Sequence, residues 1–589
     1  MFSQTEHFFY VILKSNVFEE ASAMKNLPPY DVPKITNLRD VVKTRVREYP
    51  KNPVIIHKIK KTGDYVPVST EKFDHDIDCL GTAFMSRVKK GARIAVLGET
   101  RYEWYVSYLA TTNGTGCIVP IDKELSTDEI QNMLERAQID LIVFSSLKQK
   151  EINSIYGKVE SIKYYVSMDD TDDERFLTFN NLIAEGEKLI KDGDKTFLEA
   201  PIDETEMTIL LFTSGTTSKS KAVMLSQKNI CSNLMAMFSS LYIDPDDVFF
   251  SVLPLHHTYE CTCGFLGQVY RGTTIAVCDG LRYITSEIKE AKPTAVLMVP
   301  AMIEMFYNKI MKNINSDPEK AKKFNTGLKL SKILLKVGID VRRKLFKDIH
   351  AVFGGKMRLI IVGGAPINPE IMQFFEDIGF LTLQGYGLTE CSPILALNQE
   401  YNHKHQSAGL PLAGTEVIVA NPDEDGIGEF IAKGDNIFMG YYNDPENTAA
   451  ALDSDGYYHT GDLGYIDKDG FCIITGRKKN VIIAKNGKNV FPEEIEYLLS
   501  LSPVVAESVV SGYDDTVKDD ILIQATIYPD KDVISEKLGD NPSEESIQKL
   551  LEEVVTEVNE KLVNYKKIKK VVYRPTEFEK NTSKKIKRY

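Results

Sequence analysis

No apolar stretch in this sequence of 589 residues approaches the roughly 18–20 residues that a membrane-spanning helix needs. The short apolar run Phe8–Leu13 follows Glu6 and has no basic region before it, so it does not resemble a signal peptide. Residues 1–23 show neither helical nor strand periodicity. Two interpretations stay open: these residues are an upstream extension and Met24 is the true start, or they belong to the native protein.

Cysteine is infrequent, and its eight positions are scattered over nearly the whole length: Cys79, Cys117, Cys231, Cys261, Cys263, Cys278, Cys391 and Cys472. This distribution does not resemble a disulfide framework. Cys261 and Cys263 form a C-x-C pair, not the C-x-x-C of a zinc knuckle or a redox centre. We therefore expect buried free thiols in a reducing compartment, which favours a cytoplasmic location.

Positive charge falls short of negative charge, with 71 Lys and Arg against 84 Asp and Glu and a formal net charge of −13. A protein whose main partner is nucleic acid usually carries a basic excess, so the composition argues against that class. Any anionic ligand must then be held by a local cationic site. Apolar residues at 43% and charged residues at 26% are ordinary for a folded protein, and the length predicts two to four domains.

Short apolar segments alternate with helical patterns, and these segments are predicted to be buried strands: Arg93–Gly98, Leu141–Phe144, Ala295–Val299 and Leu359–Val362. Between the first two, Ile130, Met133, Leu134 and Ala137 recur at spacings of three and four, which indicates a helix. A strand, a helix and a strand in sequence favour parallel βαβ units, so the fold class is predicted to be α/β.

The stretch from about Ile303 to Phe353 has a helical pattern and carries many lysines and arginines. One apolar face is predicted to consist of Leu330, Leu334, Val337, Val341 and Leu345. A helix that lies on a membrane surface is one interpretation. We favour the other, an inserted helical hairpin with a solvated basic face.

After Gly409 the sequence pattern changes to short predicted strands separated by Gly, Asp and Asn, which predicts a β-rich subdomain. A smaller α+β unit is predicted from about residue 480. Its helix begins at Pro492, a strand spans Ile521–Ile527, and a second helix spans Ser543–Leu562. We therefore expect a large N-terminal domain over residues 24–478, made of parallel α/β subdomains and the β-rich subdomain, and a small C-terminal domain over residues 479–589.

An apolar strand from Leu210 runs into a loop of hydroxyl side chains, one glycine and two lysines before the chain becomes apolar again. Small residues allow backbone N–H groups to approach an anion, hydroxyls add donors, and lysine adds compact positive charge. This pattern indicates polyphosphate binding, although it is not a Walker A loop. An ordinary surface loop rich in Ser and Thr is the alternative.

The loop resembles the T-S-G-T-T-G-x-P-K-G motif of the AMP-forming acyl-CoA synthetases, within the adenylate-forming enzyme superfamily. The residues that match are Thr213, Ser214, Gly215, Thr216, Thr217 and Lys221. The sequence departs from the motif at Ser218, Ser220 and Ala222. The resemblance implies that the matching residues bind ATP, that Lys221 is catalytic, and that Thr216 helps to hold a magnesium ion.

A second segment, Gln384–Glu390, resembles the Y-G-x-T-E motif of the same family. Tyr386 can offer an aromatic face to adenine, Thr389 can bind a phosphate, and Glu390 can hold Mg²⁺ through a hard oxygen ligand. The alternative is a Gly-rich turn with a capping Thr and Glu. The resemblance adds three residues after a buried strand as the lining of the adenine pocket, so the nucleotide-binding set here is Gly364, Ala365, Pro366, Gln384, Gly385, Tyr386, Gly387 and Thr389.

Further motifs follow in family order. The T-G-D motif places Asp462 at the two ribose hydroxyls, and Arg477 is expected to contact the ribose or the phosphates. Lys479 falls at the family's domain hinge, which implies that the C-terminal domain is mobile. Gly487 and Lys488 resemble the turn near the tunnel through which the thiol of coenzyme A enters.

Two catalytic positions remain. The tail Glu579–Arg588 resembles P-K-x-x-x-G-K-I-x-R and places Lys585 at the catalytic lysine, although Lys584 stands where the family has Gly. A solvated basic tail is the alternative. His257 matches the P-L-x-H motif beside the carboxylate substrate; otherwise His256 and His257 would be one packed and one exposed histidine.

The resemblance covers essentially the whole chain after Met24 and is strongest to the long-chain fatty acyl class. It implies activation of a medium- to long-chain fatty acid by ATP to an acyl-adenylate, with Mg²⁺ as the cofactor, followed by transfer to coenzyme A. Transfer to acyl carrier protein and a binding-only pseudoenzyme are the alternatives. Peripheral contact with the inner face of a membrane stays open. Some long-chain relatives gate the acyl pocket with a tryptophan after His257, whereas the single tryptophan here is Trp104.

Overall fold

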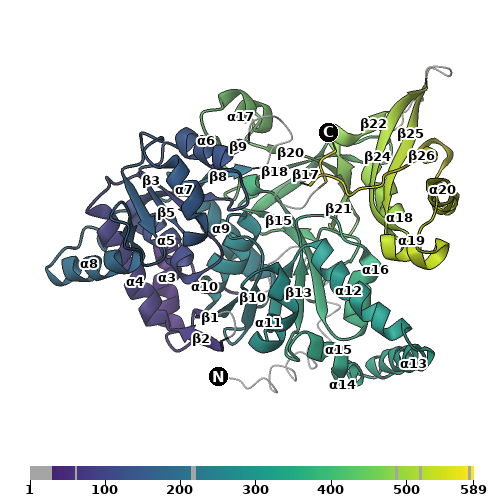
Figure 1. Cartoon of the computed structure of the whole chain (residues 1–589), viewed down its shortest axis with the longest axis horizontal. Helices are drawn as coiled ribbons and strands as arrows, with labels where there is room; N and C mark the ends of the chain where they lie inside the picture. The colour runs from purple at the N-terminus through teal and green to yellow at the C-terminus, as the bar shows by residue number, and fades with distance from the viewer. Residues whose placement is uncertain are drawn as a thin grey trace.

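The computed structural model describes residues 30–59, 63–213, 220–483, 489–515, 520–580 and 586–588, and the side chains of residues 514, 515 and 520 are left aside. Two large sheets, a four-stranded sheet and a three-stranded C-terminal sheet form the architecture (Figure 1). No helix within these ranges is both long enough and apolar enough to cross a bilayer. The fold is mixed α/β with parallel sheets, as the sequence predicts.

The first large sheet has eight strands in the order β19 (Gly440–Tyr441), β9 (Lys221–Ser226), β8 (Met207–Thr213), β4 (Gly116–Ile121), β3 (Ala92–Leu97), β5 (Leu141–Phe144), β6 (Tyr164–Ser167) and β7 (Leu177–Thr178). The pair β3–β5 is parallel, and α6 (Thr127–Ala137) lies between these strands in sequence, as predicted. A capping box between Ser126 and Glu129 starts this helix. The sequence analysis missed β4, which pairs with β3 on its other side.

The second large sheet has nine strands in the order β16 (Leu410–Pro411), β15 (Ile394–Leu397), β14 (Leu381–Gly387), β13 (Leu359–Val362), β12 (Ala295–Met298), β10 (Val248–Ser251), β11 (Thr274–Val277), β1 (Ile55–Lys58) and β2 (Tyr65–Val68). The strands from β1 to β14 are parallel to one another, and the outer pairs are antiparallel. The carboxyl ends of the parallel strands therefore meet at one edge, where open α/β sheets bind ligands.

One continuous buried core packs between the two large sheets and extends into the four-stranded sheet. Trp104 belongs to this core. It is 1% exposed, stacks on Tyr108 at 5.4 Å between ring centroids, and meets the edge of Phe265. All eight cysteines are buried and free, which confirms the expectation from their spacing.

The β-rich region consists of β17 (Thr415–Ala420), β18 (Gly428–Gly434), β20 (Tyr458–Ile466) and β21 (Cys472–Arg477). The C-terminal sheet contains β24 (Val505–Asp515), β25 (Asp520–Pro529) and β26 (Ile568–Tyr573), with α18 (Pro492–Ser500), α19 (Lys531–Leu538) and α20 (Glu544–Glu560). This C-terminal group lies at one side of the molecule (Figure 1) and has a separate buried core that runs from Ile482 to Ile568. The predicted strand and both predicted helices are present as β25, α18 and α20.

The long basic stretch forms α12 (Pro300–Asn315), α13 (Pro318–Leu335), α14 (Arg342–Leu345) and α15 (Lys347–Val352). The expected single apolar face is wrong. Helix α13 ends at Leu335, so Val337 lies in the turn after it and Leu345 in a separate short helix. Two residues join α12 to α13, the two helices lie against each other, and α13 projects from the edge of the molecule (Figure 1). These contacts fit the hairpin interpretation.

Candidate active site

A cavity of about 4080 Å³ lies where the loops after the strands of both large sheets meet. Strand β8 ends in Thr213, β10 leads to His256 and His257, β13 leads to Gly363, and β14 carries Gln384 to Gly387. The described residues among the predicted site all line this cavity: Thr213, Lys221, His257, Gly364, Ala365, Pro366, Gln384, Gly385, Tyr386, Gly387, Thr389, Glu390, Asp462, Arg477 and Lys479.

The remaining predicted site residues lie outside the described part of the chain: Ser214, Gly215, Thr216, Thr217, Gly487, Lys488 and Lys585. Described residues next to some of them line the cavity. Thr213 and Lys221 pair with each other across the β8–β9 hairpin, and both line the cavity. Ile586, Lys587 and Arg588, directly after Lys585, also line the cavity.

A chain of contacts connects the loop lysine to the acidic end of the second motif. Lys221 Nζ lies 4.4 Å from the centroid of the Tyr441 ring, and the Tyr441 hydroxyl donates a hydrogen bond to Glu390 Oε1 at 2.9 Å. Burial, followed by the charge of Glu390, raises the pKa of Tyr441, so the phenol keeps its proton. The sequence analysis missed Tyr441, because only the pairing of β19 with β9 brings it close to Lys221 and Glu390.

Asp462 is held by two donors. The Tyr386 hydroxyl donates to Asp462 Oδ2 at 2.7 Å, and Arg477 Nε lies 2.8 Å from Oδ1. Asp462 and Arg477 stand opposite each other on β20 and β21, which explains the pairing. Burial lowers the pKa of Arg477, but Asp462 and the neighbouring phenols more than offset this, and the net pKa is raised. The 4% exposed carboxylate is thus fixed in one orientation.

Two glycines of the site are required by geometry. A Cβ on Gly387 would lie 1.9 Å from the carbonyl oxygen of Pro393, because β14 and β15 approach closely there. Gly364 has a φ of +85°, which L side chains rarely adopt. A side chain at Gly387 would collide with the paired strand, and one at Gly364 would strain the backbone, so both positions favour glycine.

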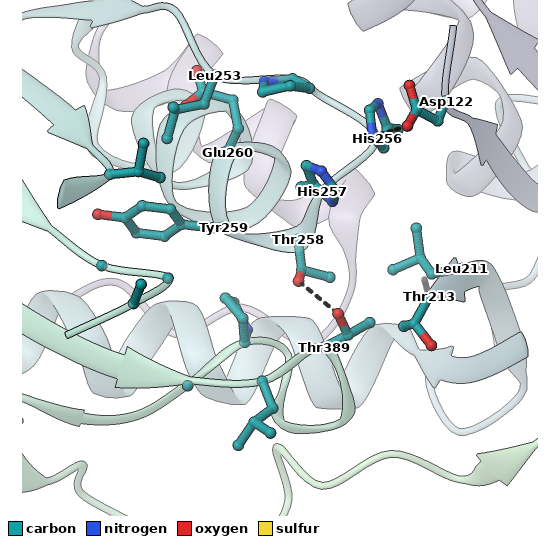
Figure 2. A pocket seen from close by; sticks show the side chains of 18 of the residues that line it. Asp122, Leu211, Thr213, Leu253, His256, His257, Thr258, Tyr259, Glu260 and Thr389 are labelled. Atoms are coloured by element: carbon teal, nitrogen blue, oxygen red, sulfur yellow. Dashed lines mark hydrogen bonds and ion pairs between the residues drawn. The ribbon is translucent and has the colours of Figure 1, made fainter. Parts of the chain in front are cut away.

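The two adjacent histidines are both partly buried, unlike the packed and exposed pair that was the alternative. Figure 2 shows His257, Thr258 and Thr389 around one space, and Thr258 Oγ1 donates to Thr389 Oγ1 at 3.5 Å. His256 Nε2 lies 3.4 Å from Asp122 Oδ2. Burial, together with His257 and Lys123, lowers the pKa of His256 well below its ordinary value, so its imidazole is neutral.

The cavity lining includes a set of apolar side chains that we call the apolar arm: Val252, Leu253, Cys278, Ile284, Val299 and Met302. Glu260 also borders the cavity and is 1% exposed. Ser251 Oγ donates to Glu260 Oε1 at 2.5 Å, and burial raises the pKa of Glu260 to about 8. The sequence analysis did not single out Glu260, since a glutamate in an apolar segment gives no signal without the fold. Trp104 is not part of the lining.

The C-terminal end of the chain reaches the same cavity. Arg588 forms a two-pronged ion pair with Glu496 on α18, with Nη1 2.8 Å from Oε1, and Nη2 lies 3.5 Å from Glu493. Burial raises the pKa of Glu496 to about 7 even with this partner. Lys479 is exposed as a residue, but its ammonium group is partly shielded from water. This desolvation, followed by repulsion from Arg477 and Arg588, lowers its pKa. Lys479, helix α18 and the tail residue Arg588 thus meet at the cavity wall.

Comparison with known proteins agrees with this geometry. The chain is 28% identical over 492 residues to long-chain-fatty-acid–CoA ligase 5 of Mus musculus, covering 77% of this chain and 70% of the relative. It is 28% identical over 498 residues to fatty acyl-CoA synthetase A of Dictyostelium discoideum, covering 80% of this chain and 73% of the relative.

Two solved structures show the same fold. ATP-bound MatB from Rhodopseudomonas palustris superposes with a TM-score of 0.70 at 24% identity, covering 94% of this chain and 97% of that one. A Mycobacterium tuberculosis fatty acyl CoA synthetase gives a TM-score of 0.63 at 21% identity, covering 94% and 96%. The family model described as AMP-binding enzyme matches residues 42–442, more than half of the chain, so the chain belongs to this family.

Proposed function

We propose that this protein is an AMP-forming acid–thiol ligase that activates a fatty acid with ATP and transfers the acyl group to coenzyme A. The observation that carries the proposal is the single cavity, in which a charged end with Lys221, Glu390 and Asp462 is continuous with an apolar arm. The similarity to fatty acid–CoA ligases supports the choice of substrates.

The chemistry needs two steps. A carboxylate is a poor acyl donor, so its oxygen first attacks the α-phosphorus of ATP and pyrophosphate leaves. The thiol sulfur of coenzyme A then attacks the acyl carbonyl, and AMP leaves. Both steps depend on positioning and on stabilising developing charge.

The charged end is proposed to hold ATP. Lys221, Thr213 and the hydroxyl loop Ser214–Thr217 face the triphosphate, Tyr386 and Gly364–Pro366 face the adenine, and Asp462 accepts hydrogen bonds from the ribose hydroxyls. The Asp462 carboxylate suits this role because Tyr386 and Arg477 already fix its orientation.

Glu390 and Thr216 are proposed to hold Mg²⁺. The Glu390 carboxylate lines the cavity near Lys221, and hard oxygen donors are the ligands that Mg²⁺ prefers. When bound, the ion neutralises triphosphate charge. The Tyr441 hydrogen bond to Glu390 orients the carboxylate.

The fatty acid is proposed to lie in the apolar arm with its carboxylate at His257. Leu253 and Val252 precede His257 on the loop after β10, so the acyl chain and the carboxylate would meet the same loop. Burial of the alkyl chain would contribute about 0.8 kcal/mol per methylene group.

Lys585 is proposed to bridge the carboxylate and the α-phosphate during the first step. The C-terminal domain, residues 479–589, would then rotate about Lys479 and bring Gly487 and Lys488 to the tunnel for coenzyme A. The tail at the cavity wall, anchored by Arg588, fits the first step.

The test compares the two half-reactions in Lys585→Ala. Pyrophosphate exchange with a fatty acid should fall by orders of magnitude, whereas thioester formation from pre-made acyl-adenylate should be largely retained. Lys584→Ala is the matched control for the neighbouring lysine. Equal loss of both half-reactions would contradict the role of Lys585. Absent exchange in the wild-type protein would favour a binding-only pseudoenzyme, and transfer to carrier protein alone would identify the other acceptor.

We also propose that α13 and the turn after it contact an anionic membrane surface. Ile333 is 64% exposed and Val337 is 68% exposed, and both are flanked by the exposed lysines Lys332 and Lys336. Exposed apolar side chains among lysines suit a surface of anionic lipids. Flotation with vesicles of phosphatidylserine and phosphatidylcholine should retain the wild type and lose Ile333→Ser/Val337→Ser. Equal flotation of both proteins, or none of the wild type, contradicts the contact.

A further inference from the structure

Two histidines and a glutamate form a cluster that is separate from the site residues described above. Glu376 lies near the end of α16 (Pro369–Asp377), and His403 and His405 lie between β15 and β16. His403 Nε2 is 3.2 and 3.3 Å from the two carboxylate oxygens of Glu376, and His405 Nε2 is 2.6 Å from Oε2. The three donor atoms lie within 4.8 Å of one another.

A backbone contact sets the tautomer of one histidine. His403 Nδ1 lies 3.2 Å from the carbonyl oxygen of Glu400. A carbonyl only accepts, so Nδ1 carries the hydrogen, and in a neutral imidazole Nε2 then presents its lone pair to the Glu376 carboxylate. Two things can make this contact favourable: a second proton on Nε2, which then donates to the carboxylate, or a metal ion bound between the nitrogen and the carboxylate. Metal-binding histidines in proteins typically have this arrangement, with the other ring N–H donated to a carbonyl.

We propose that Glu376, His403 and His405 bind one divalent transition-metal ion, for which Zn²⁺ is the best match. Imidazole and carboxylate ligands together suit Zn²⁺, whereas Mg²⁺ and Ca²⁺ prefer sites made of oxygens only. Bond lengths of about 2.0–2.2 Å in a tetrahedral site imply about 3.3 Å between ligand atoms. The separations between His403 and Glu376 match this value, and the separation between His405 and Glu376 would open by less than about 1 Å. The two histidine donor atoms lie within 4.8 Å of each other.

The site would stabilise one wall of the active-site cavity. His405 and Ala408 line that cavity. In the same segment Asn398 donates from its backbone N–H and its side-chain Nδ2 to the Gln384 carbonyl, at 3.0 and 3.1 Å. The Lys404 N–H donates to Asn398 Oδ1 at 2.9 Å. A bound ion would therefore hold α16 against the loop that supports β14 at Gln384.

The experiment uses the untagged full-length protein, stripped with a chelator and titrated with Zn²⁺. Calorimetry and elemental analysis should show one equivalent bound with a Kd in the micromolar range or tighter, together with a rise in Tm because the ion binds the folded chain. Co²⁺ should give the absorption of a site with nitrogen and oxygen ligands and no thiolate.

His403→Ala, His405→Ala and Glu376→Gln should each weaken Zn²⁺ binding by about 100-fold or more, since loss of even a supporting contact costs about 10–100-fold. His75→Ala is the matched control: His75 also faces two carboxylates, Asp76 at 3.2 Å and Glu187 at 3.9 Å, but lies on α4 (Thr70–Met85) outside the cluster. The Co²⁺ spectrum of the wild type does not depend on any variant folding. Failure of the wild type to bind at 100 µM Zn²⁺, a thiolate spectrum, or full binding by the cluster variants would overturn the proposal.

Discussion

Among single residues, Glu260 is the carboxyl group whose ionisation is most clearly shifted by its surroundings. Burial raises its pKa from 4.5 to about 8, and Ser251 donates a hydrogen bond to it. Between these two pH values the folded chain keeps a proton that the unfolded chain releases. The contribution of Glu260 to stability therefore falls as the pH rises from about 4.5 to about 8, with a slope of up to about 1.4 kcal/mol per pH unit.

The substitution Glu260→Gln removes the titration and should flatten this part of the curve. We expect the stability of the variant relative to the wild type to increase as the pH rises, with the full difference reached near pH 8. Denaturant midpoints measured from pH 5 to 8.5 would show it. The exposed Glu174→Gln serves as the control and should keep the wild-type slope. An unchanged slope in Glu260→Gln would mean that the buried carboxyl ionises without penalty.

At the level of elements, the ion pair between Arg588 and Glu496 joins the C-terminal tail to α18. Arg588 is 19% exposed and Glu496 is 15% exposed, so little water competes with their ion pair. Val510 N–H also donates to Glu496 at 2.6 Å. Lys585 is three residues before Arg588 in the sequence, so the proposed role of Lys585 can be tested through this ion pair.

Arg588→Ala should slow pyrophosphate exchange by about 10- to 100-fold, because small displacements of a positioning group are costly. It also leaves the Glu496 carboxylate without its cation, and Arg588→Ala/Glu496→Gln should recover part of the folding stability but not the exchange rate. Arg574→Ala is the control, since its guanidinium donates to the carbonyls of Thr576 and Glu577. Exchange at the wild-type rate in Arg588→Ala would show that Lys585 does not need this anchor.

The elements that the sequence predicted are those with a local signal. Helix α6 has an apolar stripe and a capping box, and β5 and β13 are short, fully apolar runs. Strand β4 was missed because it contains Pro120, and a proline inside an apolar run argues against a central strand, although Asn113 and Gly114 mark a turn just before it. The apolar stripe after Leu335 was misread because spacing alone does not show where a helix ends.

The same distinction holds for the site. Residues in contiguous motifs, such as Gln384–Glu390, were found because one segment of chain carries the whole pattern. Tyr441, Glu260 and Glu496 were not found, because each acquires its role from a partner that is brought near only by strand pairing or helix packing. The His403–Glu376 contact joins elements 27 residues apart and was invisible for the same reason.

For the whole molecule, the net charge of −13 makes the placement of cations decisive. Both proposed co-substrates are anions, and the cavity wall gathers Lys221, Arg477, Lys479 and Arg588 from four separate elements. Lys479 lies at the proposed hinge, and Arg588 lies in the C-terminal tail. Rotation of the C-terminal group would therefore change the field in the cavity as well as its shape.

Lys479→Pro tests the rotation. Lys479 is the middle residue of the short 3₁₀ turn Lys478–Asn480. Proline fixes φ at about −65°, which lies in the 3₁₀ range, and also restricts the backbone of the residue before it, Lys478. The substitution should therefore restrict rotation of the backbone at this position and oppose the change between the two arrangements. We expect pyrophosphate exchange to stay within a few-fold of the wild-type rate and thioester formation from pre-made acyl-adenylate to fall at least about tenfold in stopped-flow measurements. Lys479→Ala keeps the backbone free and should spare both steps. If proline and alanine affect the two steps alike, the side chain rather than the hinge is responsible, and the pivot lies elsewhere.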